Sequence, residues 1–366
     1  MSMMNYCKWK PVALMILVNL ALALANLLLK KVLSEGMSFL TIITYRQLVS
    51  AFFLSPIAFF YERKSRLEGD INILCLLFLS ALVGVTFTQY LFLLGLGYTS
   101  ATFSCAFLNM VPIFTFIMAL PFGIEKVNLR SMSGNAKVLG SLICIGGALL
   151  LGLYRGEPLT SINPNKSQTP PNYNNNNSSS KTLLSSSPPP SSPSQWGVGS
   201  VLLTGGCLLW SSWFLIQARI SKRYPFQYSS TAILSSFGAI QSAILNLIIN
   251  RKNNNPAAIW ILHGKLQILT VLYSGLVGSG LCYVAMSWCV KERGPVFTAA
   301  FTPLIQTFVA ILELSILHEQ IWLGSAAGSG IVIVGMYILL WGKRKEDVEK
   351  HVAKTGQANQ QDRECQ

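Results

Sequence analysis

Long apolar runs, separated by short polar stretches, set the hydrophobic pattern of this chain. A helix needs about 20 residues to cross a bilayer, at about 1.5 Å per residue. Ten runs approach that length, five in each half of the chain. The predicted spans are Pro11–Leu29, Ser38–Phe60, Ile71–Leu94, Thr99–Phe122 and Lys137–Leu153, then Gly197–Gln217, Tyr228–Ile249, Leu266–Trp288, Val296–Leu317 and Trp322–Trp341. The pattern therefore predicts an all-α membrane protein with ten transmembrane helices.

The two groups of five spans repeat a sequence motif. Ser80–Gly84 reads SALVG and Ser274–Gly278 reads SGLVG, at an offset of 194 positions. Because each group has an odd number of spans, the second group must enter the membrane from the opposite side. We therefore expect two inverted five-helix repeats, at residues 1–155 and 196–342.

The segments outside the repeats are polar. Residues 156–195 consist largely of Asn, Ser and Pro, and such a segment buries too little apolar surface to offset its chain entropy. We expect a disordered linker there and a charged tail at residues 343–366. The first apolar run also resembles a secretory signal, but its removal would leave an even number of spans in the first half.

Composition and charge agree with a membrane protein. The chain is 51% hydrophobic and 11% charged, with a mean hydropathy of +0.47. Its net charge of +14 is not carried by a basic stretch interleaved with aromatics, so nucleic acid is not an expected partner. Nineteen of the 28 basic residues lie on the side of the two termini and eight on the other. Because cytoplasmic loops collect Lys and Arg, we expect both termini in the cytoplasm.

The sequence contains none of three common enzyme motifs. The chain contains no GxxxxGK[ST], GxSxG or HExxH motif, and its three histidines and eight cysteines are scattered without metal-ligand spacing. We expect no catalytic residues, no metal and no cofactor, and we therefore do not expect an enzyme.

Two charged residues fall inside predicted spans. Arg46 is the only basic residue placed in a membrane interior, and Glu313 is the most deeply placed acid. Such groups face a cavity or a partner helix, because burying them in hydrocarbon is costly. Arg46 is a candidate counter-ion for a substrate carboxylate, or it snorkels or pairs with backbone carbonyls. Glu313 is a candidate proton-coupling group, or it makes a helix contact.

Uncharged polar and aromatic residues recur on several spans and predict a shared central cavity. Taken singly, such residues more often form hydrogen bonds between helices than contacts with a ligand. The substrate-binding candidates are Asn19, Gln89, Asn109, Thr115, Gln217, Tyr283, Trp288 and Gln306. Pro112 and Pro303 deny a backbone donor to the fourth and ninth spans, and we expect kinks or hinges there.

Several longer stretches resemble a known transporter family. The stretches YRQ, SPIAFFYERKSR, GLGYTSATFSCAFLNMVPIFTF, GLVGSGLCYVAMSWCVKERGPVFTAAFTPL, LHEQIWLGS and MYILLWGK are similar to the plant nodulin-like, Walls-Are-Thin-related branch of the EamA drug/metabolite transporters. The resemblance covers nearly the whole chain except the linker and the tails. It implies a fold of two inverted five-helix repeats and membrane transport of amino acids, auxin or related small organic metabolites, often in both directions.

The expected function is thus transport of a small-molecule substrate across a lipid bilayer, by alternating access around a cavity at the midplane. We expect the plasma membrane, with the tonoplast as the alternative; the oligomeric state is left open. A phosphate-ester or nucleotide-sugar exchanger is the second hypothesis, but its substrates would require several buried cations beyond Arg46. The third hypothesis is a membrane receptor or scaffold that transports nothing.

Overall fold

The computed structural model places most of the chain in helices. The residues it describes are 2–34, 37–62, 71–98, 107–124, 131–153, 193–252, 260–262, 264–312, 315, 327–328, 330–331, 333–339, 341–342 and 345–346. In the first half the helices are α1 (Ser2–Ser34), α2 (Phe39–Tyr61), α3 (Ile71–Ala81), η1 (Leu82–Phe87), α4 (Thr88–Tyr98), α6 (Val111–Ala119) and α7 (Met132–Leu153). In the second half they are α8 (Pro193–Arg223), α9 (Gln227–Ile249), η2 (Asn250–Lys252), α10 (Lys265–Tyr273), η4 (Ser274–Leu281), α11 (Cys282–Arg293), α12 (Pro295–Ala300) and α13 (Thr302–Leu312).

Within the described residues, six helices are long and apolar enough to cross a membrane. They are Trp9–Leu33, Phe39–Tyr61, Ile71–Phe92, Gly197–Arg223, Gln227–Ile249 and Lys265–Arg293. They coincide with the first three predicted spans of each half. Pro295–Val309 forms a shorter apolar helix. The described parts of the other predicted spans are also helical, and the count of ten remains a prediction.

Both ends of α8 follow from local sequence. The helix begins at Pro193, inside the segment predicted as linker, because proline at the first helical position lacks only a donor that would be unpaired anyway. It continues past Gln217, the predicted end of the span, and finishes with Lys222 and Arg223 in its last turn. Cations there stabilise the negative end of the helix dipole. The longer helix therefore carries its charged end out of the apolar layer.

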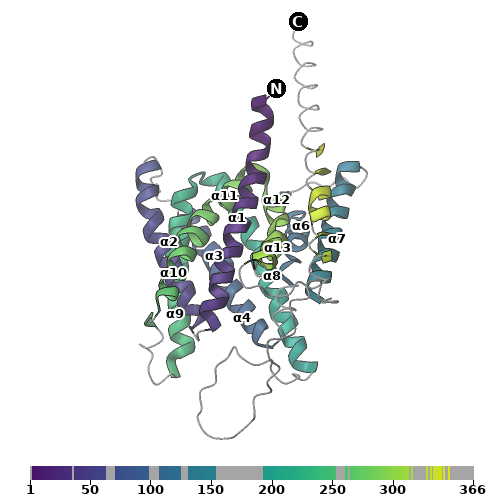
Figure 1. Cartoon of the computed structure of the whole chain (residues 1–366). Helices are drawn as coiled ribbons and strands as arrows, with labels where there is room; N and C mark the ends of the chain where they lie inside the picture. The colour runs from purple at the N-terminus through teal and green to yellow at the C-terminus, as the bar shows by residue number, and fades with distance from the viewer. Residues whose placement is uncertain are drawn as a thin grey trace.

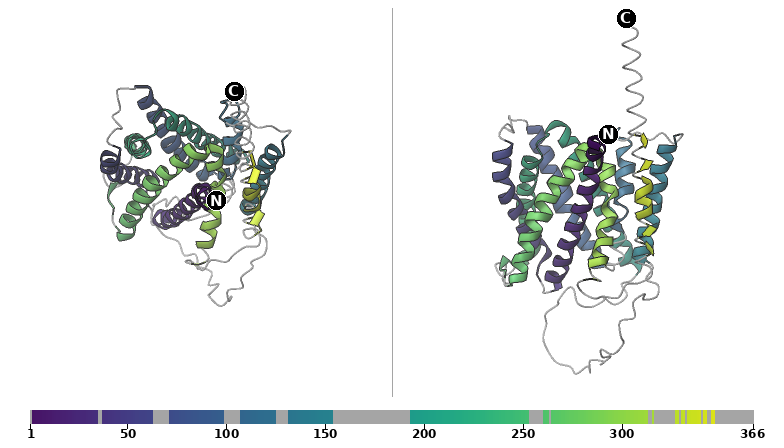
Figure 2. Two further views of the ribbon diagram at one scale, coloured as in Figure 1. Left: turned by 90° about the horizontal axis from the view of Figure 1, so that it is seen from above. Right: turned by 45° about the horizontal axis from the view of Figure 1, so that its top comes forward.

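The helices form one bundle in which the two halves run in opposite senses. In Figure 1, α1 begins at the top, near the N-terminus, whereas α8 begins at the bottom. Seen from above, α7 lies beside the described C-terminal helical segments along one edge of the bundle (Figure 2). Contacts between the halves also correspond, since α1 packs on η4, α11 and α13 while α8 packs on η1, α4 and α6.

The repeated motif forms a π-helix in both halves. η1 interrupts the third helix of the first half, and η4 interrupts the matching helix of the second. Segments with π-helical bonding are rare and are frequently found at functional sites. In η1, Gly84 lies directly against the indole of Trp213 from α8. The motif that the two halves share therefore lies where the third helix of each half changes from α-helical to π-helical geometry.

Substituting Gly84 with alanine is expected to destabilise the protein. An added Cβ would lie 2.1 Å from Cδ1 and 2.9 Å from Cβ of Trp213, so the tryptophan or its helix has to move. Overpacking of this kind costs about 1–3 kcal/mol. Thermal unfolding of the purified protein in detergent measures the effect. The matched control is Gly146→Ala, because no atom of the described residues lies within 4 Å of a Cβ built there. Equal melting temperatures for the two variants would contradict this prediction.

A ladder of polar side chains connects α2 to α9. Asn246 Nδ2 donates to Thr41 Oγ1 at 3.1 Å, and Thr44 Oγ1 donates to Ser242 Oγ at 3.2 Å. Further along, Ser50 and Ser235 share a hydrogen bond of 3.0 Å. Small polar side chains let two membrane helices approach closely and bond across the interface.

The ladder continues to the end of the pair. The Glu62 carboxylate accepts hydrogen bonds from the backbone N–H groups of Tyr228 and Ser229 at 3.1 and 2.8 Å. It therefore satisfies donors in the first turn of α9 that have no partner inside the helix. Hydrogen bonds thus connect α2 and α9 at several points along their length, and Glu62 caps the first turn of α9. The two helices therefore form one antiparallel unit.

Candidate functional site

Arg46 and Gln47 of α2 converge on one serine of the second half. Arg46 is half-buried, and its Nε donates to Ser279 Oγ at 2.7 Å. Gln47 Nε2 donates to the same oxygen at 3.3 Å. Ser279 lies in η4, which approaches α2 so closely that a Cβ on Gly275 would lie 2.7 Å from Val49. A single hydroxyl thus holds a guanidinium group inside the bundle.

An aromatic wall, formed by Trp210, Trp213 and Tyr283, lies beside this guanidinium group. Tyr283 of α11 is only 3% exposed, and its ring centroid lies 5.3 Å from that of Trp213 and 6.4 Å from that of Trp210. The two indoles of α8 stack at 5.3 Å. Tyr283 and Arg46 also interact electrostatically. The first half therefore supplies the cation and the second half supplies the aromatic surface.

Buried polar atoms without partners accompany these groups. Among the described residues, nothing bonds to the Oε1 atoms of Gln47, Gln89 and Gln217 or to Nε1 of Trp213. The other end of the Gln217 amide is used, since its Nε2 donates to Ser287 Oγ at 2.8 Å. A buried unsatisfied polar group costs about 1–3 kcal/mol. These three acceptors and this donor are therefore unsatisfied within the described part of the chain.

Asn109 and Gln306 join the two halves at a second place. Asn109 is 2% exposed, and its Nδ2 donates to Gln306 Oε1 at 2.8 Å. Asn109 lies in the turn before α6, and Gln306 is the fifth residue of α13. Pro112 is the second residue of α6 and Pro303 the second residue of α13, each directly after a turn.

The two breaks have the same backbone geometry. The N–H of Met110 bonds to the carbonyl of Phe107 at 2.9 Å, and the N–H of Phe301 bonds to that of Thr298 at 3.3 Å. Each bond joins residues three positions apart. In both breaks the proline lies two positions after the residue that donates, and it has no N–H of its own. The amide pair therefore joins the turn before α6 to the first half of α13.

The remaining candidates do not share these contacts. Asn19 Nδ2 donates to Met15 O at 2.6 Å and Thr115 Oγ1 to Val111 O at 2.8 Å, both within their own helices. Trp288 packs, partly buried, against the main hydrophobic core. Glu313 lies outside the described residues.

Sequence reasoning missed Ser279, Ser287 and the role of Gln47. The first two are serines in long apolar helices, where serine most often bonds its own backbone. A signal did exist for two of the three residues, Gln47 and Ser279. Gln47 directly follows Arg46 in YRQ, and Ser279 directly follows the repeated motif SGLVG.

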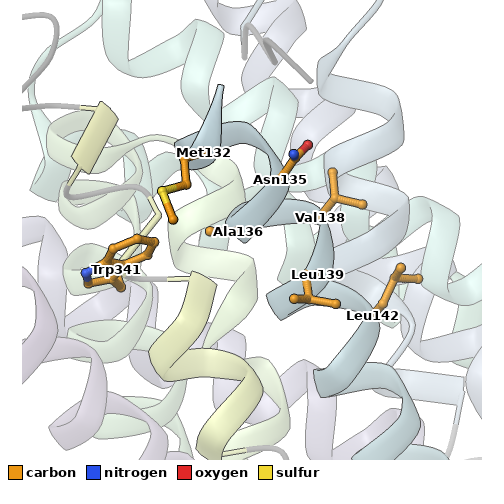
Figure 3. A pocket seen from close by; sticks show the side chains of 7 residues that line it. All are labelled: Met132, Asn135, Ala136, Val138, Leu139, Leu142 and Trp341. Carbon is orange, nitrogen blue, oxygen red and sulfur yellow. The ribbon is translucent and has the colours of Figure 1, made fainter. Parts of the chain in front are cut away.

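The structure also contains an open groove, but at a different place. It has a volume of about 500 Å³ and is lined by Met132, Asn135, Ala136, Val138, Leu139, Leu142 and Trp341 (Figure 3). None of the candidate residues lines it. Of the groups that converge between the halves, Gln47, Asn109 and Tyr283 are buried, whereas Arg46 and Gln306 are partly buried.

Comparisons with known proteins match nearly the entire chain. The model of the EamA-like transporter family matches residues 9–153 and 197–341. WAT1-related protein At4g01440 of Arabidopsis thaliana is 49% identical over 95% of this chain and 92% of its own length. WAT1-related protein At3g30340 of the same plant is 48% identical over 92% of this chain and 88% of its own.

A solved crystal structure supports the fold independently. It shares 13% sequence identity with this chain, with a TM-score of 0.60, and the match covers 92% of this chain and 98% of the other. At that identity the likeness concerns the fold alone. The family match, the close relatives and the six apolar helices together indicate a transporter rather than an enzyme. The chain belongs to the EamA-like transporter family and is an integral, multi-pass membrane protein.

Proposed function

We propose that this protein transports amino acids or auxin-like compounds by alternating access around the buried polar groups between its two halves. The observation that carries the proposal is Arg46, held by Ser279 of the other half beside the aromatic wall. A guanidinium group in that position is suited to a single carboxylate. Trp213 Nε1, a buried donor without a partner among the described residues, is a candidate second donor to the substrate.

The unpaired acceptors favour a substrate that also carries donors. The Oε1 atoms of Gln47, Gln89 and Gln217 are suited to an ammonium or an indole N–H. Amino acids and indole carboxylates both combine a carboxylate with such a donor. The aromatic wall offers an apolar surface to the rest of the molecule.

We further propose that Asn109 and Gln306 form a gate. Their hydrogen bond closes one path between the halves in this conformation, and the neighbouring helix breaks supply the places where the backbone bends. Opening the gate breaks one amide–amide bond, which costs about 0.5–1.5 kcal/mol. A gate of that strength opens readily.

For the cellular setting we propose the plasma membrane, with both termini in the cytoplasm. The excess of basic residues on the side of the termini supports this orientation.

Flux measurements test the proposed function. The full-length protein in proteoliposomes is expected to exchange radiolabelled amino acids or indole acids across the membrane. Uptake and efflux are measured separately, at acidic and neutral pH, against protein-free liposomes. Absence of flux for every compound, in both directions and at both pH values, would overturn the proposal for these substrates.

A further inference from the structure

The groove on the outer edge of the bundle is separate from the proposed transport path. Its walls are α7 and the C-terminal helical segment that carries Trp341 (Figure 3). These two elements pack backbone to backbone, because a Cβ on Gly140 would lie 2.5 Å from Leu339 N and one on Gly335 would lie 2.5 Å from Cys144 N. The groove follows the side of this closely packed pair.

The groove opens towards the hydrocarbon of the bilayer. Met132, Leu139 and Leu142 are 66%, 54% and 58% exposed, and they lie along α7. Trp341 faces Met132 from the opposite wall (Figure 3). Around a membrane-spanning helix such an apolar surface contacts acyl chains. The apolar wall of the groove is therefore suited to contact one acyl chain of a lipid.

Charged side chains lie at the end of the groove where α7 begins. The Lys345 ammonium lies 3.2 Å from Met132 Sδ and 5.4 Å above the Trp341 ring. The neighbouring Lys137 is 4% exposed and is paired with Glu346, so this pair contributes no net charge. In the sequence, Lys343 and Arg344 come directly before Lys345. Basic residues next to a membrane helix attract anionic lipid head groups.

We infer that this groove binds an anionic phospholipid of the surrounding bilayer. One acyl chain lies along Leu139 and Leu142, the indole of Trp341 packs against its upper part, and the phosphate is held at Lys345. Asn135, on the groove wall, supplies an amide for the head group. The inference is independent of the transported substrate.

Competitive lipid retention tests the inference on the full-length protein. The protein is reconstituted with equal amounts of phosphatidylserine and phosphatidylcholine of the same acyl composition, extracted in mild detergent and weighed by native mass spectrometry. We expect about fivefold preferential retention of phosphatidylserine, the effect of one basic residue near an anionic head group. Lys345→Gln is expected to abolish the preference. The matched control is Lys222→Gln, an exposed lysine at the end of α8, which is expected to keep it.

Groove-filling variants separate the site from general attraction to basic residues. Leu139→Trp keeps every charge but occupies the groove, so retention of both lipids at this site is expected to fall. If that variant does not fold, as judged by thermal unfolding, Leu142→Trp serves the same purpose. Equal retention of the two lipids by the native protein, or an unchanged preference in Lys345→Gln, would overturn the inference. A dimer that Leu139→Trp dissociates would also overturn it, because the groove would then bind a second copy of the chain.

Discussion

Replacing Arg46 with glutamine is expected to lower the initial rate of transport at least tenfold, with nearly normal amounts of protein in the membrane. The substitution removes the positive charge beside Tyr283 and the Nε donor to Ser279. A hydrogen bond to a charged group contributes about 1.5–3 kcal/mol, and about 1.4 kcal/mol corresponds to a factor of ten. Initial uptake in proteoliposomes, normalised to the protein incorporated, measures the change.

Two further variants show which property of Arg46 is needed. Arg46→Lys keeps the charge but loses the planar fork of donors, and we expect an intermediate rate. Arg219→Gln is the control, because its guanidinium lies 5.3 Å above Phe122, at the end of a helix and away from the site. If Arg46→Gln loses membrane abundance in proportion to flux, or keeps normal flux, Arg46 is a structural residue.

Joining positions 109 and 306 covalently is expected to abolish transport. Asn109 and Gln306 are replaced by cysteine in a chain whose eight native cysteines have been removed. A short bifunctional thiol reagent then links the two, since a direct disulfide would require Cα atoms about 5.5–6 Å apart. Flux should disappear when the link forms, because the gate cannot open. It should return when a reducible linker is cleaved.

The polar ladder provides the matched control for this experiment. Thr44 and Ser242 are hydrogen-bonded between α2 and α9 at 3.2 Å, in a pair that we expect to move as one unit. Cysteines at these positions, linked by the same reagent, are expected to leave flux nearly unchanged. Normal flux in the linked 109/306 protein would dismiss the gate. A block in both proteins would mean that α2 and α9 also separate during transport.

Hydropathy alone predicts where the spanning helices lie, because the length of an apolar run is set by the membrane. The six spans that qualify by length and composition coincide with predicted runs. The repeat and the two prolines also indicated that helices four and nine correspond. They placed Asn109 and Gln306 on matching elements, and the two side chains meet.

Partners of single polar residues could not be predicted in the same way. Lys137 was assigned to the end of a span and Glu346 to a charged tail, yet the two form an ion pair. Ser279 meets Arg46 because the π-helical turns of η4 set its direction, and no hydrophobic period encodes such a turn. Rotation about a helix axis depends on packing against neighbours. The hydrophobic pattern of a single sequence contains little information about this rotation.

The contact between Gly84 and Trp213 has a thermodynamic consequence for a carrier with inverted repeats. If the halves were identical, a two-fold rotation about an axis in the membrane plane would relate the inward-open and outward-open conformations, which would then have equal free energy. The position that corresponds to Gly84 is Gly278, where the nearest atoms to an added Cβ are those of Ala25 and Ser274, at 3.9 Å. A tryptophan in one half therefore stands where the other half has small side chains. In an alternating-access carrier this asymmetry would give the unloaded protein a preferred resting orientation, and a substrate gradient would work against that bias in one direction and with it in the other.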